Sequence, residues 1–235
     1  MKITSTEVKN SFGKYLRLCH SEPVYITKNG KTIAQLLNYT EKPNLVKDPS
    51  GAYNLRRNLM TYEEFTEMNE DAKERYEFID GEVYMLSAPS VYHQRMVSRL
   101  HIALDRYLEG KPCDVFESPF DVTLLRKGDA NRTNVVQPDL LVICDWEKDV
   151  NENERYMGIP RLVIEVLSPG NTVKEMITKL DLYRDSGVEE YWIVDTKRLQ
   201  VIVYQFENYE ITGTKIFKEN EPCRSFIYKE FEFEL

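Results

Sequence analysis

The sequence predicts a mixed α/β body over residues 61–235, preceded by a small α+β unit over residues 1–44. Three observations carry this prediction. Residues 161–195 have the pattern strand, helix, strand, which is typical of a parallel βαβ unit. Asp80-Gly81 separates two strand-like runs over residues 76–86, and Asn29-Gly30 does the same over residues 24–37. Both dipeptides are strong hairpin signals.

The small unit is expected to contain a strand, a helix and a hairpin, in that order. Residues 1–4 form the expected strand, and residues 5–19 have apolar residues at helical spacing. A unit of this size buries little apolar surface alone, so we expect it to form a homodimer. Residues 45–60, which contain Pro49 and Gly51, are expected to be a linker.

The body is expected to contain three helices, each with a capping residue at its start. They cover residues 61–73, 90–108 and 171–184, and they begin at Thr61, Ser90 and Asn171. Glu64 stands three residues after Thr61, which makes that start a capping box. Besides the strands named above, strands are expected at residues 113–117, 120–125, 139–144, 199–206 and 209–212.

The composition is that of a globular protein with a core of its own. Apolar residues make up 42% of the chain and charged residues 30%. There is no run of about 18 apolar residues and no signal peptide, so neither a membrane span nor secretion is expected. The four cysteines form no CxxC pair, and we expect them to be free thiols of a cytoplasmic protein.

Charge is distributed unevenly between the two parts. Residues 1–44 carry seven Lys/Arg and three Asp/Glu, a net charge of +4. This leaves 24 of the 31 basic and 36 of the 39 acidic residues in the remainder, a net charge of −12. The acidic body counts against unspecific coating of DNA, because phosphate contacts need Lys and Arg. It excludes neither a nuclease that brings a divalent metal into a carboxylate cleft nor an enzyme with another substrate.

Two apolar strands each contain one carboxylate. Asp139 begins the run 139–144, and Glu165 stands in the middle of residues 162–167. An ionised carboxylate in a buried strand is costly unless it is paired or binds a metal. Asp139 alone also fits a solvated strand start after Pro138, and Glu165 alone fits a buried pair with Lys or Arg. Together the two carboxylates favour a Mg²⁺ or Mn²⁺ site.

Lys179 stands fourteen residues after Glu165, in the helix that follows the strand. Its spacing from Met176 and Tyr183 places it beside the apolar stripe of that helix. From there it could orient a nucleophilic water or offset charge on a phosphate oxyanion. The other interpretation is a surface lysine whose stem lies along the helix.

Two further residues are candidates for the site. Glu77, in the first strand of the hairpin over residues 76–86, suits a site carboxylate and an exposed cross-strand charge equally. His93 lies in the first turn of the helix expected at residues 90–108 and could support the site. A lone histidine is more often a hydrogen-bonded structural group. Tyr183 and Trp192 are expected in the core.

Five segments of the body resemble, in their order, the Uma-two family of restriction-endonuclease-like proteins, within the PD-(D/E)XK nuclease superfamily. They are residues 75–84 (RYEFIDGEVY), 138–140 (PDL), 165–169 (EVLSP), Lys179 with Tyr183, and 187–195 (GVEEYWIVD). As a set in fixed order these motifs are specific. The resemblance covers roughly residues 60–235.

The resemblance implies a four-stranded mixed sheet flanked by helices, with Asp139 and Glu165 as metal ligands. It further implies a supporting carboxylate from Glu77 and coordination by the backbone carbonyl of Val166. The superfamily's E-x-K pattern is absent, because a leucine stands two residues after Glu165. The resemblance implies that the lysine has moved into the next helix, where Lys179 stands.

Residues 1–40 resemble the Phd/YefM antitoxin domain, through residues 3–8, 10–12 and 24–31. That domain dimerises and binds operator DNA through its N-terminal helical region. The resemblance therefore implies DNA contacts from Lys9, Lys14 and Arg17. Antitoxins of this type carry a toxin-binding tail, and here a nuclease-like body takes its place, so a toxin partner stays open.

Three functions follow from these residues. The first is a homodimeric endodeoxyribonuclease with a DNA-binding head, in which Asp139 and Glu165 hold Mg²⁺ or Mn²⁺ and Lys179 stabilises the attacked phosphate. The second is a non-catalytic DNA-binding regulator similar to an antitoxin repressor, with a degenerate nuclease-fold body. The third is a structural α/β domain in which Glu165 and Lys179 form a buried ion pair.

Overall fold

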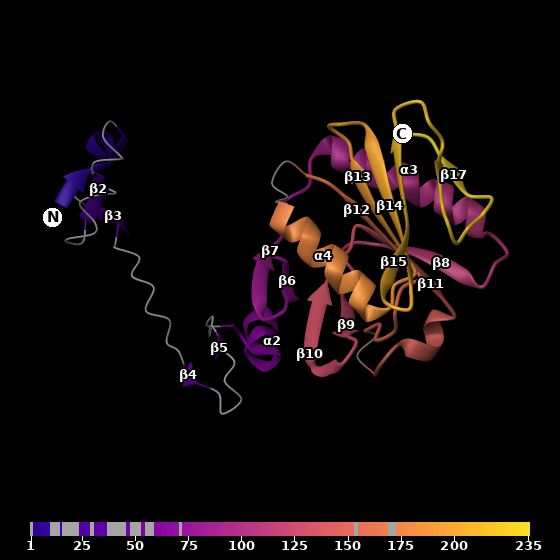
Figure 1. The fold of residues 1–235 in the computed structure, drawn as a ribbon, viewed down its shortest axis with the longest axis horizontal. Helices are drawn as coiled ribbons and strands as arrows, with labels where there is room; N and C mark the ends of the chain where they lie inside the picture. Colours follow the sequence, from indigo (N-terminus) through magenta and orange to yellow (C-terminus); the bar gives the residue numbers. More distant parts are fainter. Residues whose placement is uncertain are drawn as a thin grey trace. The chain divides into compact units, whose positions relative to one another are not determined.

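The computed structural model describes residues 2–9, 15, 24–28, 31–36, 46–47, 53–54, 59–70, 72–152, 155–168 and 173–235. The chain divides into two compact units, Met1–Asn58 and Leu59–Leu235 (Figure 1). Each unit has its own core, so we describe each by itself.

The smaller unit contains a three-stranded sheet. β1 (Lys2–Thr4) pairs in parallel with β2 (Val24–Lys28), and β2 pairs in antiparallel fashion with β3 (Lys31–Leu36). Residues 5–9 are helical, and Ile3, Tyr15 and Val24 are buried together. The expected order of strand, helix and hairpin is therefore observed among the described residues.

Two short strands lie in the region expected to be a linker. β4 (Val46–Lys47) pairs in antiparallel fashion with β5 (Tyr53–Asn54). The rest of residues 45–58 lies outside the described part of the chain, as does the Asn29-Gly30 turn. The extent of the linker stays a prediction.

The larger unit is built on a six-stranded mixed sheet. Its strand order is β15-β14-β13-β12-β11-β8; β12 and β13 pair in parallel, and the other neighbours pair in antiparallel fashion. Its strands are β8 (Cys113–Glu117), β11 (Leu140–Cys144), β12 (Leu162–Val166), β13 (Glu190–Asp195), β14 (Gln200–Glu207) and β15 (Glu210–Lys218). The implied sheet of four strands is wrong, because the β14–β15 hairpin extends it.

Two helices cover opposite faces of this sheet (Figure 1). α3 (Val91–Leu108) packs against the face that carries Leu140 and Ile164. α4 (Val173–Ser186) packs against the face that carries Leu141 and Val163, since successive strand residues point to opposite sides. The order β12, α4, β13 is the expected βαβ unit. Among the described residues, no helix is long and apolar enough to cross a membrane.

The caps of two helices are as predicted. The side chain of Ser90 accepts a hydrogen bond from the His93 N–H at the start of α3. In the capping box before α2 (Tyr62–Glu70), the Thr61 N–H donates to Glu64 Oε2 at 2.8 Å, and the Glu64 N–H donates to Thr61 Oγ1 at 3.2 Å. Asn171, the expected cap of α4, lies outside the described residues.

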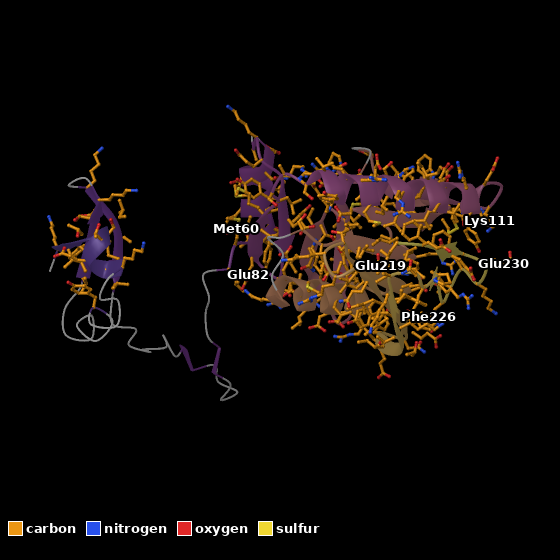
Figure 2. The ribbon with its side chains drawn as sticks, turned by 90° about the horizontal axis from the view of Figure 1, so that it is seen from above. Met60, Glu82, Lys111, Glu219, Phe226 and Glu230 are labelled. Carbon is orange, nitrogen blue, oxygen red and sulfur yellow. A yellow bond between two sulfur atoms is a disulfide. The ribbon has the colours of Figure 1, made fainter. Side chains whose placement is uncertain are left out.

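A second, four-stranded antiparallel sheet lies at the end of the larger unit where Figure 2 labels Met60 and Glu82; Lys111 and Glu230 lie at the other end. Its order is β7-β6-β10-β9, with β6 (Tyr76–Ile79), β7 (Glu82–Met85), β9 (Val122–Arg126) and β10 (Asp129–Val136). β10 was not predicted, because its first six residues are mostly polar and a bulge interrupts its pairing with β9. The short elements η1 (Trp146–Asp149), β16 (Cys223–Arg224) and β17 (Glu232–Phe233) were also not predicted.

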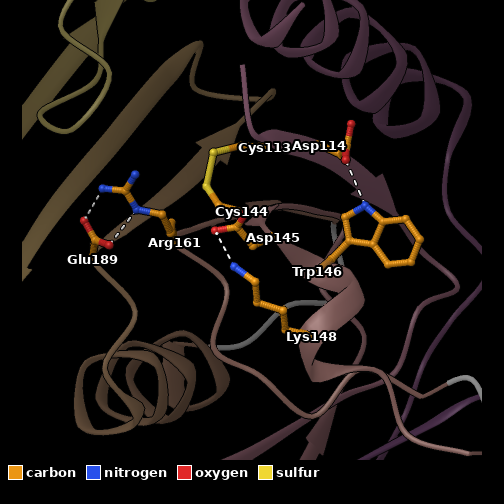
Figure 3. The surroundings of a disulfide bond; sticks show 8 residues. All are labelled: Cys113, Asp114, Cys144, Asp145, Trp146, Lys148, Arg161 and Glu189. Carbon is orange, nitrogen blue, oxygen red and sulfur yellow. Dashed lines mark hydrogen bonds and ion pairs between the residues drawn. A yellow bond between two sulfur atoms is a disulfide. The ribbon is translucent and has the colours of Figure 1, made fainter. Parts of the chain in front are cut away.

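The prediction of free thiols is wrong for Cys113 and Cys144, which form a disulfide (Figure 3). The two residues stand opposite each other in the antiparallel pair β8 and β11. Their separation of 31 residues forms no motif, so only the strand register brings them together. Cys223 is a buried free cysteine, and Cys19 lies outside the described residues.

Candidate active site

Asp139 and Glu165 lie opposite each other at the same end of two neighbouring strands. β11 and β12 pair with Leu140 opposite Ile164, and this register extended by one residue sets Asp139 opposite Glu165. The backbone N–H of Val166 donates to Asp139 Oδ2 at 2.8 Å. The two carboxylates that the sequence singled out are therefore brought together by the pairing of their strands.

Lys179 joins the two sheets of the larger unit through their carboxylates. Its Nζ lies 2.8 Å from Glu165 Oε1 on β12 and 2.9 Å from Glu77 Oε1 on β6. The side chains of Lys179 and Glu165 are 6% and 13% exposed, and that of Glu77 is fully buried. Glu77 is therefore no exposed cross-strand charge, and Lys179 is no surface lysine.

Two donors that sequence reasoning did not place in the site, one side chain and one backbone N–H, complete its hydrogen bonds. The O–H of Tyr183 donates to Glu165 Oε1 at 2.7 Å. The backbone N–H of Gln137 donates to Glu77 Oε1 at 2.9 Å. Tyr183 is fully buried, as predicted for a core residue, and it serves the site as well. Its signal was its position four residues after Lys179, one helical turn along the same face.

His93 lies beside Asp139. Its Nε2 is 3.1 Å from Asp139 Oδ2, and the ring is buried at the start of α3. Its Nδ1 is buried and has no hydrogen-bond partner among the described residues. His93 therefore supports the carboxylate through one ring nitrogen, as the sequence suggested it could.

Burial and neighbouring charges shift the pKa values of Glu165, Lys179 and His93. Burial is the main reason that the pKa of Glu165 is raised to about 7; Lys179 lowers it, whereas the charges of Asp139 and Glu77 raise it. Burial lowers the pKa of Lys179, but the two carboxylates outweigh this and hold it well above 10.5. Lys179 is therefore a cation at neutral pH and cannot act as a base.

The pKa of His93 follows the same balance. Burial lowers it, but the hydrogen bond and the charge of Asp139 raise it above its usual value of 6.5. Protonation of His93 is thus favoured while Asp139 carries its charge.

These residues line one cavity of about 300 Å³. Asp139, Glu165, Lys179 and His93 all reach it, and polar groups such as Gln94 and Ser118 surround them. A small polar cavity with several ionisable groups is the usual setting for catalysis. The arrangement can hold a small charged group, and it offers both carboxylates and one fixed cation.

The donor set fits a divalent cation. Glu165 and Glu77 contact the Lys179 ammonium group, and the charge of Asp139 acts on Glu165, so negative charge is in excess when all three carboxylates are ionised. Within the described residues, Glu77 Oε2 is buried without a hydrogen-bond partner, which is costly for a carboxylate oxygen. Among those residues, no group of three or more His, Cys, Asp or Glu side chains is placed to hold a metal ion. Mg²⁺ keeps several waters and needs only one or two carboxylates from a protein, so an open site suits it.

The predicted roles of the remaining site residues stay predictions. The Val166 N–H contacts Asp139, whereas coordination by its carbonyl stays a prediction. Lys9 is exposed in the smaller unit, while Lys14 and Arg17 lie outside the described residues. Their contacts with DNA and the Phd/YefM resemblance also stay predictions.

Comparison with known proteins identifies relatives of this chain. An uncharacterised protein of Synechocystis sp. is 27% identical over 143 residues, which are 60% of this chain and 72% of that protein. A second uncharacterised protein of the same organism is 25% identical over 176 residues, covering 74% of this chain and 94% of that protein. The crystal structure of a putative nuclease belonging to DUF820 from Anabaena variabilis has a TM-score of 0.60 at 20% identity, covering 74% of this chain and 94% of that one. This likeness shows the fold.

The family match spans the candidate site. The model of the Uma2 family, described as "Putative restriction endonuclease", matches residues 62–233. That range includes Glu77, Asp139, Glu165 and Lys179 and covers most of the chain. The chain therefore belongs to the Uma2 family of putative restriction endonucleases.

Proposed function

We propose that this protein is a metal-dependent nuclease that hydrolyses phosphodiester bonds of DNA. The observation that carries the proposal is that Asp139, Glu165 and Lys179 line one cavity, where Lys179 contacts both Glu165 and the buried Glu77. Burying these charged groups together is costly. In a nuclease, the carboxylates would bind the divalent cation and the ammonium group would contact the phosphate. The family match and the fold shared with the putative nuclease from Anabaena variabilis support this class of chemistry.

In this proposal Asp139 and Glu165 hold Mg²⁺ or Mn²⁺, with the Val166 carbonyl as a further ligand. When bound, the ion supplies Lewis acidity toward a phosphate oxygen and lowers the pKa of water. Lys179 stays protonated and donates to a phosphate oxygen on which charge develops. His93 and the Val166 N–H orient Asp139, and Tyr183 orients Glu165.

The test is cleavage of labelled single-stranded and duplex oligonucleotides with and without Mg²⁺ or Mn²⁺. We expect Asp139→Asn and Glu165→Gln each to lower the rate by at least about a hundredfold. Asp105→Asn, which removes the same charge from an exposed position on α3, serves as the matched control. Metal-independent cleavage, or equal rates in the site variants and the control, would overturn the proposal.

A second candidate is a non-catalytic body whose Lys179–Glu165 pair only stabilises the fold. The closed contact of 2.8 Å between these side chains favours it, because a structural ion pair has the same geometry. Calorimetric titration with Mn²⁺ separates the two candidates. Binding that Glu165→Gln abolishes supports the nuclease, and absence of binding supports the structural pair or a DNA-binding regulator.

The smaller unit is proposed to bind duplex DNA and to form a homodimer. Lys9, which is exposed at the end of the helical residues 5–9, is the one predicted DNA contact that falls among the described residues. In the full chain, Lys9→Ala should weaken duplex binding without changing the cleavage rate of a short single strand. Equal duplex affinity of the unmodified protein and Lys9→Ala would show that Lys9 does not contact DNA.

A further inference from the structure

A second and larger cavity adjoins the candidate active site. Its volume is about 870 Å³, and Ser168 lines both it and the cavity of the carboxylates. The two cavities also share the first turns of α3. His93 and Gln94 line the smaller one, and Tyr92 and Arg95 line the larger one. Any chain bound at the carboxylates could therefore continue into the second cavity.

The second cavity is basic although the chain as a whole carries a net charge of −8. Four cations line it, namely Arg95, Arg99, Lys197 and Arg198. Among its described lining residues, Asp195 is the single acidic side chain, and it accepts hydrogen bonds from the backbone N–H groups of Lys197 and Arg198. Within the described part of the chain, Arg95 and Lys197 form no ion pair. Their charge is available to an anionic ligand.

Apolar and aromatic side chains stand between these cations. Met96, Met176 and Leu167 line the cavity, as does Tyr92, which is 77% exposed. A ligand that carried phosphates alone would gain nothing from such walls. Nucleic-acid bases offer apolar faces to these walls only when they are unpaired and unstacked, because a duplex hides them. The combination of cations and apolar walls therefore favours a single strand.

We propose that the second cavity binds an unpaired segment of the nucleic acid, next to the phosphate that Lys179 would contact in the candidate active site. Arg95 and Lys197 would contact its phosphates, and Tyr92 would stack on a base. The inference rests on the proposed function and deepens it, since it makes a single strand, or a single-stranded stretch beside a duplex, the favoured substrate. A cavity of this volume is large enough for a nucleotide.

Binding of a dye-labelled single-stranded oligonucleotide to the full chain tests the inference. Fluorescence anisotropy in EDTA measures affinity without any cleavage, and a duplex of the same sequence provides the comparison. The double variant Arg95→Ala/Lys197→Ala should weaken single-strand binding by about tenfold or more. The slope of log affinity against log salt should fall by about 1.4, the value expected for two lost phosphate contacts with a single strand.

The double variant Arg106→Ala/Lys111→Ala is the matched control. It removes the same two types of charge from exposed positions at the far end of α3 and just beyond it, outside this cavity. It should bind as the unmodified protein does. Tyr92→Ala should weaken single-strand binding by about tenfold, whereas Tyr92→Phe, which keeps the ring, should not. Melting temperatures of all variants check that each one folds.

Two results would overturn the inference. One is an equal loss of affinity in the cavity variant and the control variant, which would mean unspecific attraction by charge. The other is single-strand binding that Tyr92→Ala leaves unchanged; tight duplex binding does not count here, because the smaller unit is itself proposed to bind a duplex. Because binding is measured without metal, these outcomes are independent of the proposed catalysis. A protein that cleaves normally but binds through other residues would leave the nuclease proposal intact.

Discussion

Lys179 Nζ lies 2.8 Å from Glu165 Oε1, and Lys179 stands fourteen residues after Glu165 in the sequence, on a helix that begins at Val173. The same nitrogen contacts Glu77, which comes from a different sheet and stands 102 residues away. A single ammonium group thus holds together two carboxylates from two sheets. This contact links the stability of the larger unit to its candidate chemistry.

Loss of Lys179 is expected to destabilise the fold strongly. Lys179→Met keeps the stem but leaves Glu77 and Glu165 buried without their cation, which should lower the free energy of unfolding by about 3–5 kcal/mol. Lys174→Met is the control, because Lys174 pairs with Glu82 at the surface and should lose less than about 1 kcal/mol. Urea denaturation measures both. If both variants lost the same free energy of unfolding, the buried contacts of Lys179 would stabilise the fold no more than a surface ion pair does.

The strand pairing that builds the site was predictable in its parts. Apolar runs around Asp139 and Glu165 identified two buried strands, and the burial cost of a carboxylate singled out both residues. The caps at Thr61 and Ser90 fixed the starts of two helices through local hydrogen bonds. Each of these signals acts over a few residues, which is why sequence alone carried them.

The contacts across the fold were not predictable by the same reasoning. Glu77 could be exposed or buried until the pairing of β6 with β10, a strand of mostly polar residues, set β6 inside a four-stranded sheet. Tyr183 occupies a core position at helical spacing, and nothing local shows that its O–H meets a carboxylate. The disulfide depends on the register of two strands. All three depend on tertiary pairing, which no local pattern encodes.

Reduction of the disulfide is expected to lower stability. Cys113 and Cys144 are separated by 31 residues, and closing a loop of this length removes unfolded-state entropy equivalent to about 3–4 kcal/mol. Dithiothreitol should therefore lower the melting temperature of the protein by roughly 5–15 °C. The variant Cys113→Ala/Cys144→Ala should melt lower at the outset and should not respond to dithiothreitol. A melting temperature that stays constant while thiol titration shows full reduction would contradict the expectation.

Metal affinity is expected to depend on pH through Glu165. A ligand carboxylate must be ionised, and the pKa of Glu165 is raised to about 7. Mn²⁺ affinity, measured by calorimetry between about pH 5.5 and 8.5, should therefore fall about tenfold per unit below pH 7 and level off above it. His93→Gln is the control for the histidine beside Asp139, and it should keep this dependence. Affinity that is independent of pH would exclude Glu165 as a titrating ligand.

Glu165 should also make the stability of the metal-free protein depend on pH. Its contribution to the free energy of unfolding should change with pH in the direction opposite to that of an ordinary surface carboxyl. The folded state keeps the proton of Glu165 up to about pH 7, whereas the unfolded chain releases it near 4.5. The contribution of Glu165 to the free energy of unfolding therefore falls as pH rises from about 4.5 to about 7. Urea denaturation of Glu165→Gln, which cannot titrate there, should lack this fall. An identical pH profile in both proteins would contradict it.

Tyr183→Phe should shift both pH dependences upward. The phenolic O–H donates to Glu165 at 2.7 Å, and a hydrogen bond to the ionised form of a carboxyl lowers its pKa. Without that donor, Glu165 should hold its proton to higher pH, and the midpoint of Mn²⁺ binding should move up with it. Phenylalanine keeps the ring in the core, so the substitution should lower the free energy of unfolding by only about 1–3 kcal/mol. Tyr191→Phe, a second buried tyrosine that packs against Tyr183, is the control and should leave the midpoint unchanged. If Tyr183→Phe leaves the midpoint where it is, the hydrogen bond does not set the charge of Glu165, and Tyr183 is a core residue alone.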